Sequence, residues 1–155
     1  MVVVPPTPRT AGAEASTPST PDPAHGVAGE ETAAGRYIRF QSVTATEAGI
    51  NPGVFFLTGE LGRAGLLAPE DERQWQTANE WYDAHCTDPS TVDPSLYTRY
   101  PRAACWFRAE AGVVLDRIAL YLDILDRYGV PYERRESFRP GRVVYSDDTQ
   151  VVVTP

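Results

Sequence analysis

The densest group of side chains that could do chemistry in this sequence is Asp83-Ala84-His85-Cys86, with Asp88 close behind it. Thiolates, imidazoles and carboxylates bind zinc, and a cysteine beside a histidine can act as a nucleophile with its base. Neighbouring residues on a helix point about 100° apart, however, and no second cluster supplies further ligands. We therefore expect His85 to interact with a helix C-terminus and Cys86 to pack, with no metal and no cofactor.

A second pair of candidate residues, Asp147 and Asp148, lies between two strand-like segments. Paired carboxylates can hold a divalent cation or act as acid and base. Tight turns also select aspartate for its backbone preferences, and this tip offers too few fixed ligands for a metal. Asp147 and Asp148 are kept as candidate binding residues, and the catalytic residues stay unknown.

Trp106 and Arg108 are candidate recognition residues because they fall off the apolar stripe of the long helix predicted there. An exposed tryptophan near an arginine can form a recognition spot or a cation–π pair. In the alternative interpretation, Trp106 covers the sheet edge or the proline-rich segment 87–101.

Tyrosine and arginine also alternate along two predicted strands. The residues expected to face outward are Tyr37, Arg39 and Gln41 on the first strand and Tyr132, Arg134 and Glu136 on the later one. If these strands are neighbours, the two sets merge into one surface that could stack bases or receive a protein partner. The alternative is a solvated face with cross-strand charge pairs.

Several function classes are disfavoured by what the sequence lacks. It contains no GxxxxGK[ST] loop, no GxGxxG after a strand, and neither HExxH nor GxSxG. The formal net charge is −7, which repels phosphate backbones and anionic membranes. Nucleic-acid binding is therefore not expected, although a local basic patch stays open.

The two cysteines, Cys86 and Cys105, are too few for a disulfide framework. We expect both to be small apolar residues in a reducing cytoplasm, with a bridge between them as the alternative. The sequence shows no signal-peptide pattern and no apolar run long enough to span a bilayer, so a cytoplasmic protein without membrane contact is predicted.

The elements that must position these residues begin after a compositionally biased segment. Residues 1–35 are rich in proline, alanine and threonine and predict a disordered tail, either a docking segment for a proline-recognising module or a linker or upstream-start extension. Residues 36–155 predict one domain. Its first elements are a strand at 36–43, a helix at 54–64, a helix from Pro69 and a turn-rich loop at 87–101.

The strongest pattern is an apolar stripe at spacings of 4 and 3. It comprises Phe107, Ala111, Val114, Ile118, Tyr121, Leu125 and Tyr128. This stripe predicts a helix of about twenty residues, ended by Gly129 and Pro131. We expect it to be a central helix packed on a sheet; the alternative is a coiled-coil seam, so a homodimer stays open.

Three strands are predicted at the C-terminal end, at 131–138, 142–146 and 149–153. The order β-α-α-α-β-β-β predicts an α+β fold with helices on one face of an antiparallel sheet. The first strand is expected to pair with the C-terminal strands.

Residues 36–155 resemble a family of small uncharacterised proteins from high-GC actinobacteria. The segments that carry the resemblance are Tyr37-Ile38-Arg39-Phe40, Pro52-Gly53-Val54-Phe55, Asp88-Pro89, Trp106-Phe107-Arg108, Tyr121-Leu122-Asp123-Ile124-Leu125, Pro140-Gly141-Arg142-Val143-Val144-Tyr145, Asp147-Asp148 and Gln150-Val151. None of these segments is a catalytic signature, so the resemblance implies an intact domain and no particular activity.

Two functional hypotheses follow. The first is a non-enzymatic interaction or regulatory module whose partner is a protein. The second is a small enzyme or small-molecule-binding domain, with a site assembled from Trp106 and Arg108, the 87–101 loop and the C-terminal hairpin.

Overall fold

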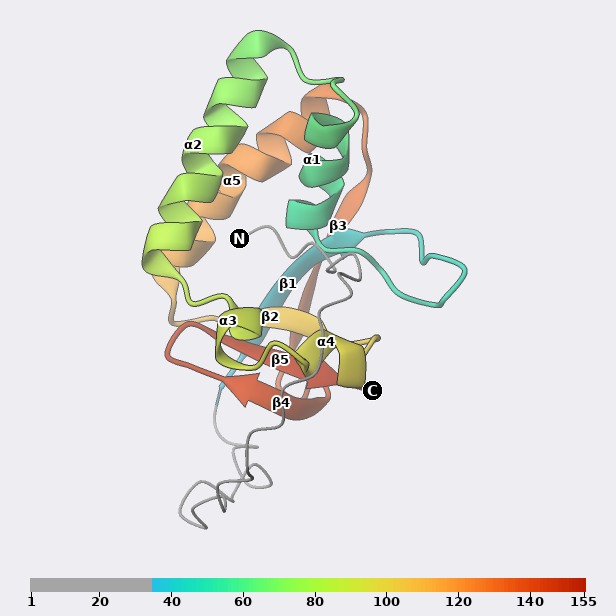
Figure 1. Cartoon of the computed structure of the whole chain (residues 1–155), viewed down its shortest axis with the longest axis vertical. Helices are drawn as coiled ribbons and strands as arrows, with labels where there is room; N and C mark the ends of the chain where they lie inside the picture. Colours follow the sequence, from blue (N-terminus) through green and yellow to red (C-terminus); the bar gives the residue numbers. More distant parts are fainter. Residues whose placement is uncertain (1–34) are drawn as a thin grey trace, which may run out of the picture.

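A computed structural model describes residues 35–155, so residues 1–34 of the predicted tail lie outside the described part (Figure 1). The elements are β1 (Tyr37–Ser42), α1 (Val54–Arg63), α2 (Pro69–His85), α3 (Pro89–Val92), α4 (Leu96–Arg99), β2 (Ala104–Arg108), α5 (Gly112–Arg127), β3 (Tyr132–Ser137), β4 (Arg142–Ser146) and β5 (Gln150–Thr154). The predicted α+β class is confirmed.

The strands form one antiparallel sheet in the order β3-β1-β2-β5-β4. Helices α1, α2 and α5 group together above the sheet, and α1 starts next to β1 and runs away from it (Figure 1). The segment that leads into α3 is tied to β5 by a hydrogen bond of 2.6 Å from the Gln150 side chain to the Thr87 carbonyl. The described residues contain no helix that combines the length and apolar character needed to cross a bilayer.

The predicted long helix from Phe107 is wrong at its start. Residues 104–108 form β2, and α5 begins only at Gly112. Phe107 has helical spacing to Val114, but it is also one of the alternating residues of a strand, with Trp106 packed on the opposite face. Hydrogen-bonded pairing with β1 on one side and β5 on the other stabilises the strand. The sheet therefore has one strand more than the predicted order.

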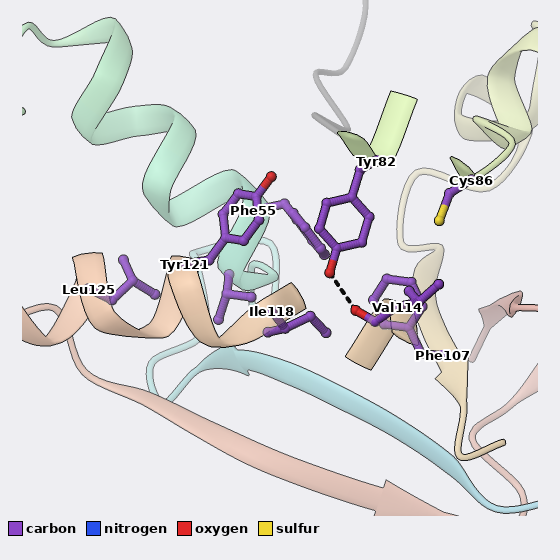
Figure 2. Packing of buried hydrophobic residues seen from close by; sticks show 9 residues of the cluster. Phe55, Tyr82, Cys86, Phe107, Val114, Ile118, Tyr121 and Leu125 are labelled. Atoms are coloured by element: carbon purple, nitrogen blue, oxygen red, sulfur yellow. Dashed lines mark hydrogen bonds between the residues drawn. The ribbon is translucent and has the colours of Figure 1, made fainter. Parts of the chain in front are cut away.

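The stripe on α5 lies in the core, as expected for a central helix. Its buried members are Val114, Ile118, Tyr121 and Leu125. They pack against α1 and α2, and Figure 2 shows them gathered around Phe55 and Tyr82. The Tyr82 hydroxyl donates a hydrogen bond of 2.5 Å to the Val114 carbonyl, which satisfies a polar group inside this apolar cluster (Figure 2).

The segment predicted as a loop at 87–101 contains the two short helices α3 and α4. The Asp88 carboxylate accepts a hydrogen bond of 2.9 Å from the Ser90 backbone N–H, which caps the start of α3. Pro89 is the first helical residue, where a missing N–H is harmless. The turn-forming residues thus begin a short helix rather than an open loop.

β1 and β3 are neighbours, as expected, but their candidate residues do not merge into one surface. The register pairs Arg39 with Arg135 and Phe40 with Arg134. Paired residues share a face of the sheet, so Arg134 and Tyr132 lie on the face of Phe40, opposite to that of Arg39. A shift of the pairing by one residue would move every side chain of one strand to the opposite face of the sheet. Local sequence patterns on β1 and β3 do not determine this register.

Tyr37 and Arg39, which were expected to face solvent, are only 5% and 9% exposed. Tyr37 packs with Val151, Val153 and Trp106 in a second apolar cluster on the sheet face away from the main core. The three consecutive valines of β5 are buried on both faces, so this second face requires apolar cover. Arg39 is buried for a different reason, which defines the candidate site.

Candidate ligand-binding site

The site lies where β1 and β2 part. These strands pair only at Tyr37 with Arg108 and Ile38 with Phe107, whereas β1 and β3 pair along the whole of β1. Beyond Ile38 the edge of β1 is instead occupied by the chain that leads into α1, through a bridge between Gln41 and Gly53. A gap is left between β1 and β2, two interior strands of the sheet.

Arg39 fills this gap with its guanidinium group. One terminal nitrogen donates to the Cys105 carbonyl at 2.7 Å, the other donates to the Asn51 carbonyl at 2.9 Å, and Nε donates to the Gln41 side chain at 2.9 Å. Within the part of the chain that the structure describes, no carboxylate pairs with Arg39. Burial lowers the pKa of Arg39, because the charged guanidinium is removed from water.

A cavity of about 270 Å³ opens beside Arg39. Its apolar walls come from several elements and include Phe40, Val54, Phe55, Phe107 and Ile118. Phe55, Phe107 and Ile118, which all line this space, lie close together in the core cluster (Figure 2). Thr46, in the loop after β1, is exposed and also lines the cavity, so it marks the open side.

The first turn of α1 faces the same space. Val54, Phe55 and Phe56 line the cavity, and a Cβ placed on Gly53 would lie 3.6 Å from both terminal nitrogens of Arg39. No side chain caps this helix, and its first turn contains no acidic residue. Uncapped N–H groups and the helix dipole give such a turn a partial positive charge.

Tyr97, on α4, supplies a further polar group to the cavity wall. Its hydroxyl is buried and has no hydrogen-bond partner among residues 35–155. Burial raises the pKa of Tyr97, so the hydroxyl stays protonated and can donate, and the nearby Arg39 opposes the shift only in part.

The Cys105 thiol donates a hydrogen bond of 3.0 Å to Gln150 Oε1. Burial raises the pKa of Cys105 to about 12, so the group is a thiol rather than a nucleophilic thiolate at neutral pH. The described residues that line the cavity include no carboxylate and no histidine.

Behind Cys105, a polar network anchors the hairpin to the rest of the fold. Gln150 donates to Asp147 Oδ2 at 3.2 Å, and the Tyr145 hydroxyl donates to the same oxygen at 2.7 Å. Burial alone would raise the pKa of Asp147, but hydrogen bonds from Tyr145 and from the Thr149 and Gln150 backbone hold it below its ordinary value. Asp147 therefore has a structural role in the turn.

Three of the predicted site residues, Tyr37, Arg108 and Asp147, come together. The Arg108 guanidinium lies 5.7 Å from the centre of the Tyr37 ring, and its Nε donates to the Asp147 carbonyl at 2.8 Å. A second bond of 2.7 Å reaches the Ser146 hydroxyl. Arg108 thus links β1, β2 and the hairpin turn, away from the cavity lining.

Trp106 lies on the other side of Arg39. Together with Arg39 and Arg102 it lines a second, more polar hollow of about 320 Å³. Arg39, Ile50 and Ala104 line both spaces, so the cavity and this hollow are neighbours. Of the two interpretations of Trp106, cover for the sheet fits better, since it packs on the second apolar cluster.

The remaining predicted residues lie elsewhere. Tyr132 donates to Asp126 at 3.2 Å, and Arg134 pairs with Glu136 at 2.5 Å, both along the edge strand β3. Asp148 is exposed at the tip of the hairpin. The structure does not bring these three residues to the cavity.

The Asp83–Asp88 segment forms no metal centre in the described part of the chain, which contains no group of three metal-ligating side chains. His85 stacks on Trp81 with 4.3 Å between ring centres and contacts the Trp81 carbonyl at 2.7 Å. Cys86 is buried in the main core, and both cysteines are free.

Sequence reasoning selected Arg39 but missed Tyr97 and the first turn of α1, which line the cavity, and Asn51, whose carbonyl accepts a hydrogen bond from Arg39. The one available signal was the Asn51-Pro52-Gly53 turn. It follows the strand of Arg39 and precedes a helix whose first turn contains no acidic residue. Tyr97 lies in a segment without periodicity, so nothing in its spacing indicated a buried hydroxyl.

Comparison of the chain with protein-family models, with curated proteins and with solved structures finds no match. The resemblance to an actinobacterial family stays a prediction, and the functional argument rests on the geometry of the site.

Proposed function

We propose that this protein binds a small, largely apolar organic molecule in the cavity between α1, β1 and β2. The observation that carries the proposal is the cavity itself, about 270 Å³ with mainly apolar walls and a few polar groups at one end. A cavity of roughly 150 Å³ lined by similar side chains is enough to hold benzene. Ligand sites commonly combine such walls with a small number of placed polar groups.

This function corresponds to the second of the two hypotheses, with a different site. The interaction hypothesis rested in part on one Tyr and Arg surface, whereas Tyr37 and Arg39 are buried and Arg134 lies on the other face. The 87–101 segment contributes Tyr97 to the cavity, but the hairpin does not line it. The absence of a carboxylate or histidine among the described lining residues supports binding rather than turnover.

The proposal is tested by blocking the open side of the cavity. Thr46→Trp introduces a large side chain at an exposed lining residue, so folding should be little affected while the cavity is obstructed. Binding of phenylacetate, phenylacetamide and 2-phenylethylamine is measured by saturation-transfer NMR and calorimetric titration. We expect at least one of these compounds to bind the unmodified protein and to lose at least about tenfold in affinity in T46W.

Thr44→Trp is the matched control, because Thr44 is an exposed residue of the same loop that does not line the cavity. T44W should bind as the unmodified protein does. Equal affinities in T46W and T44W, or no binding of any of the three compounds to the unmodified protein, would overturn the proposal.

A further inference from the structure

We infer that the ligand carries a carboxylate group, held at the end of the cavity by Arg39, the Tyr97 hydroxyl and the first turn of α1. This inference rests on the proposed binding function and adds the chemical class of the ligand. Three groups would bind the carboxylate, and they come from three different elements: Arg39 from β1, Tyr97 from the short helix α4, and the N-terminus of α1.

The first group is the Arg39 guanidinium, which is 9% exposed. A guanidinium has five N–H donors, and the described residues accept from three of them. A buried charge without a counter-charge is strongly unfavourable, whereas a carboxylate can accept two parallel bonds from the arginine fork. A carboxylate ligand would thus supply the partner that residues 35–155 do not.

The second group is Tyr97, whose buried hydroxyl lacks a partner among the described residues. Tyr97 and Arg39 both line the cavity. A hydroxyl that stays protonated donates to an anion, so Tyr97 and Arg39 can both contribute donors to a carboxylate bound in this cavity.

The third group is the first turn of α1, which has no side-chain cap and no acidic residue. Gly53 precedes this turn and lies beside Arg39, because a Cβ placed on it would be in ordinary contact, 3.6 Å from both terminal guanidinium nitrogens. Helix N-termini stabilise anions through free N–H groups and the helix dipole. All three groups are therefore donors or positive, which excludes an ammonium head group.

The charge and the walls together favour a carboxylate over a phosphate. One arginine, one hydroxyl and one helix turn suit a single negative charge, and the described lining contains no second cation. The remaining walls are apolar, which suits a hydrocarbon or aromatic body. The ligand class is thus a small amphipathic monocarboxylate.

The decisive experiment compares compounds that share a phenyl body and differ in the head group. Phenylacetate, phenylacetamide, 2-phenylethylamine and phenyl phosphate are titrated into the full chain at neutral pH. We expect phenylacetate to bind about tenfold or more tightly than the amide, and more tightly than the amine or the phosphate. Equal binding of acid and amide, or tighter binding of the amine or the phosphate, would overturn the carboxylate assignment.

Variants locate the head group. Arg39→Gln should reduce the affinity for phenylacetate about tenfold and leave phenylacetamide nearly unchanged, so that the preference for the acid disappears. Arg135→Gln is the matched control, because Arg135 is the exposed cross-strand partner of Arg39 and does not line the cavity. A preserved acid preference in R39Q would contradict the inference.

If R39Q does not fold, Tyr97→Phe provides the same test with a smaller change, and a preserved acid preference in Y97F would then contradict the inference. The two proposals fail in different ways. Binding without preference for the acid overturns only the head-group assignment, whereas absence of binding to the unmodified protein overturns the binding function itself.

Discussion

At the residue scale, a group that would help to bind the ligand can destabilise the ligand-free protein. A buried hydroxyl without a partner, such as that of Tyr97, lowers the free energy of unfolding of the ligand-free protein. The Tyr145 hydroxyl is the useful contrast, because it donates to Asp147 at 2.7 Å. Removing the hydroxyl should therefore have opposite effects on the free energy of unfolding at the two tyrosines.

We expect Tyr97→Phe to raise the free energy of unfolding of the ligand-free protein by about 1 kcal/mol, because it removes an unsatisfied buried group. Tyr145→Phe should lower it by about 1 kcal/mol, because Asp147 loses a donor. Urea denaturation of both variants measures the difference. A loss of stability in Y97F as large as that in Y145F would mean that the Tyr97 hydroxyl has a partner in the folded protein.

Asp147 makes the stability depend on acid. Its pKa is lowered in the folded chain, so the unfolded chain binds the proton more readily, and this contribution is present at neutral pH and lost as the pH falls below about 4. Asp147→Asn should lose about 1 kcal/mol at neutral pH and show a shallower decline in acid. The exposed neighbour provides the control Asp148→Asn, and unfolding free energies between pH 2 and 7 separate the two.

The sequence predicted part of the site at this scale. Arg39 was selected because it alternates with apolar residues on a strand, and it does line the cavity. Its burial was not predicted, since burial results from the parting of β1 and β2, which involves residues 66 positions apart in the chain. The Tyr97 hydroxyl was missed for the same reason: its neighbours are close only in the folded chain.

At the element scale, the packing of α1 on α2 depends on a glycine. A Cβ added at Gly62 would lie 2.4 Å from the Trp75 ring, well inside contact distance. Gly112, at the start of α5, has open space around it. These two helical glycines therefore differ in what an added methyl group would meet.

We expect Gly62→Ala to lower the free energy of unfolding by about 1–3 kcal/mol, because the Trp75 ring must move. Gly112→Ala should raise it by about 0.5 kcal/mol, because alanine restricts the unfolded chain and favours the helix. Thermal and urea denaturation measure both changes. A stabilising G62A would show that helix propensity outweighs the contact with Trp75.

The elements themselves were predicted well where a local pattern decides them. The helix starts at Val54 and at Pro69 and the three C-terminal strands agree with the structure. β2 was missed because Phe107 fits both a helical stripe and a strand, and only its pairing with neighbouring strands distinguishes the two. The short helices α3 and α4 were missed because their residues are typical of turns.

At the scale of the whole molecule, the fold class was predicted from the segregation of helices and strands, whereas the strand order was not. Placing β1 and β2 in the interior of the sheet depends on pairings between distant segments, such as Tyr37 with Ser137. Local sequence patterns do not encode such pairings. The cavity lies where β1 and β2 part, so local sequence patterns do not predict its position either.

The parting of β1 from β2 also has a consequence for the order in which the protein folds. The β4–β5 hairpin closes a short loop, but β1 finds its long partner, β3, only after nearly the whole domain is available. Closing so long a loop has a high entropic cost and is therefore slow. Before β3 pairs with β1, only two residue pairs with β2 stabilise β1 in the sheet. We therefore expect the wall that holds Arg39 to be among the last parts to assemble.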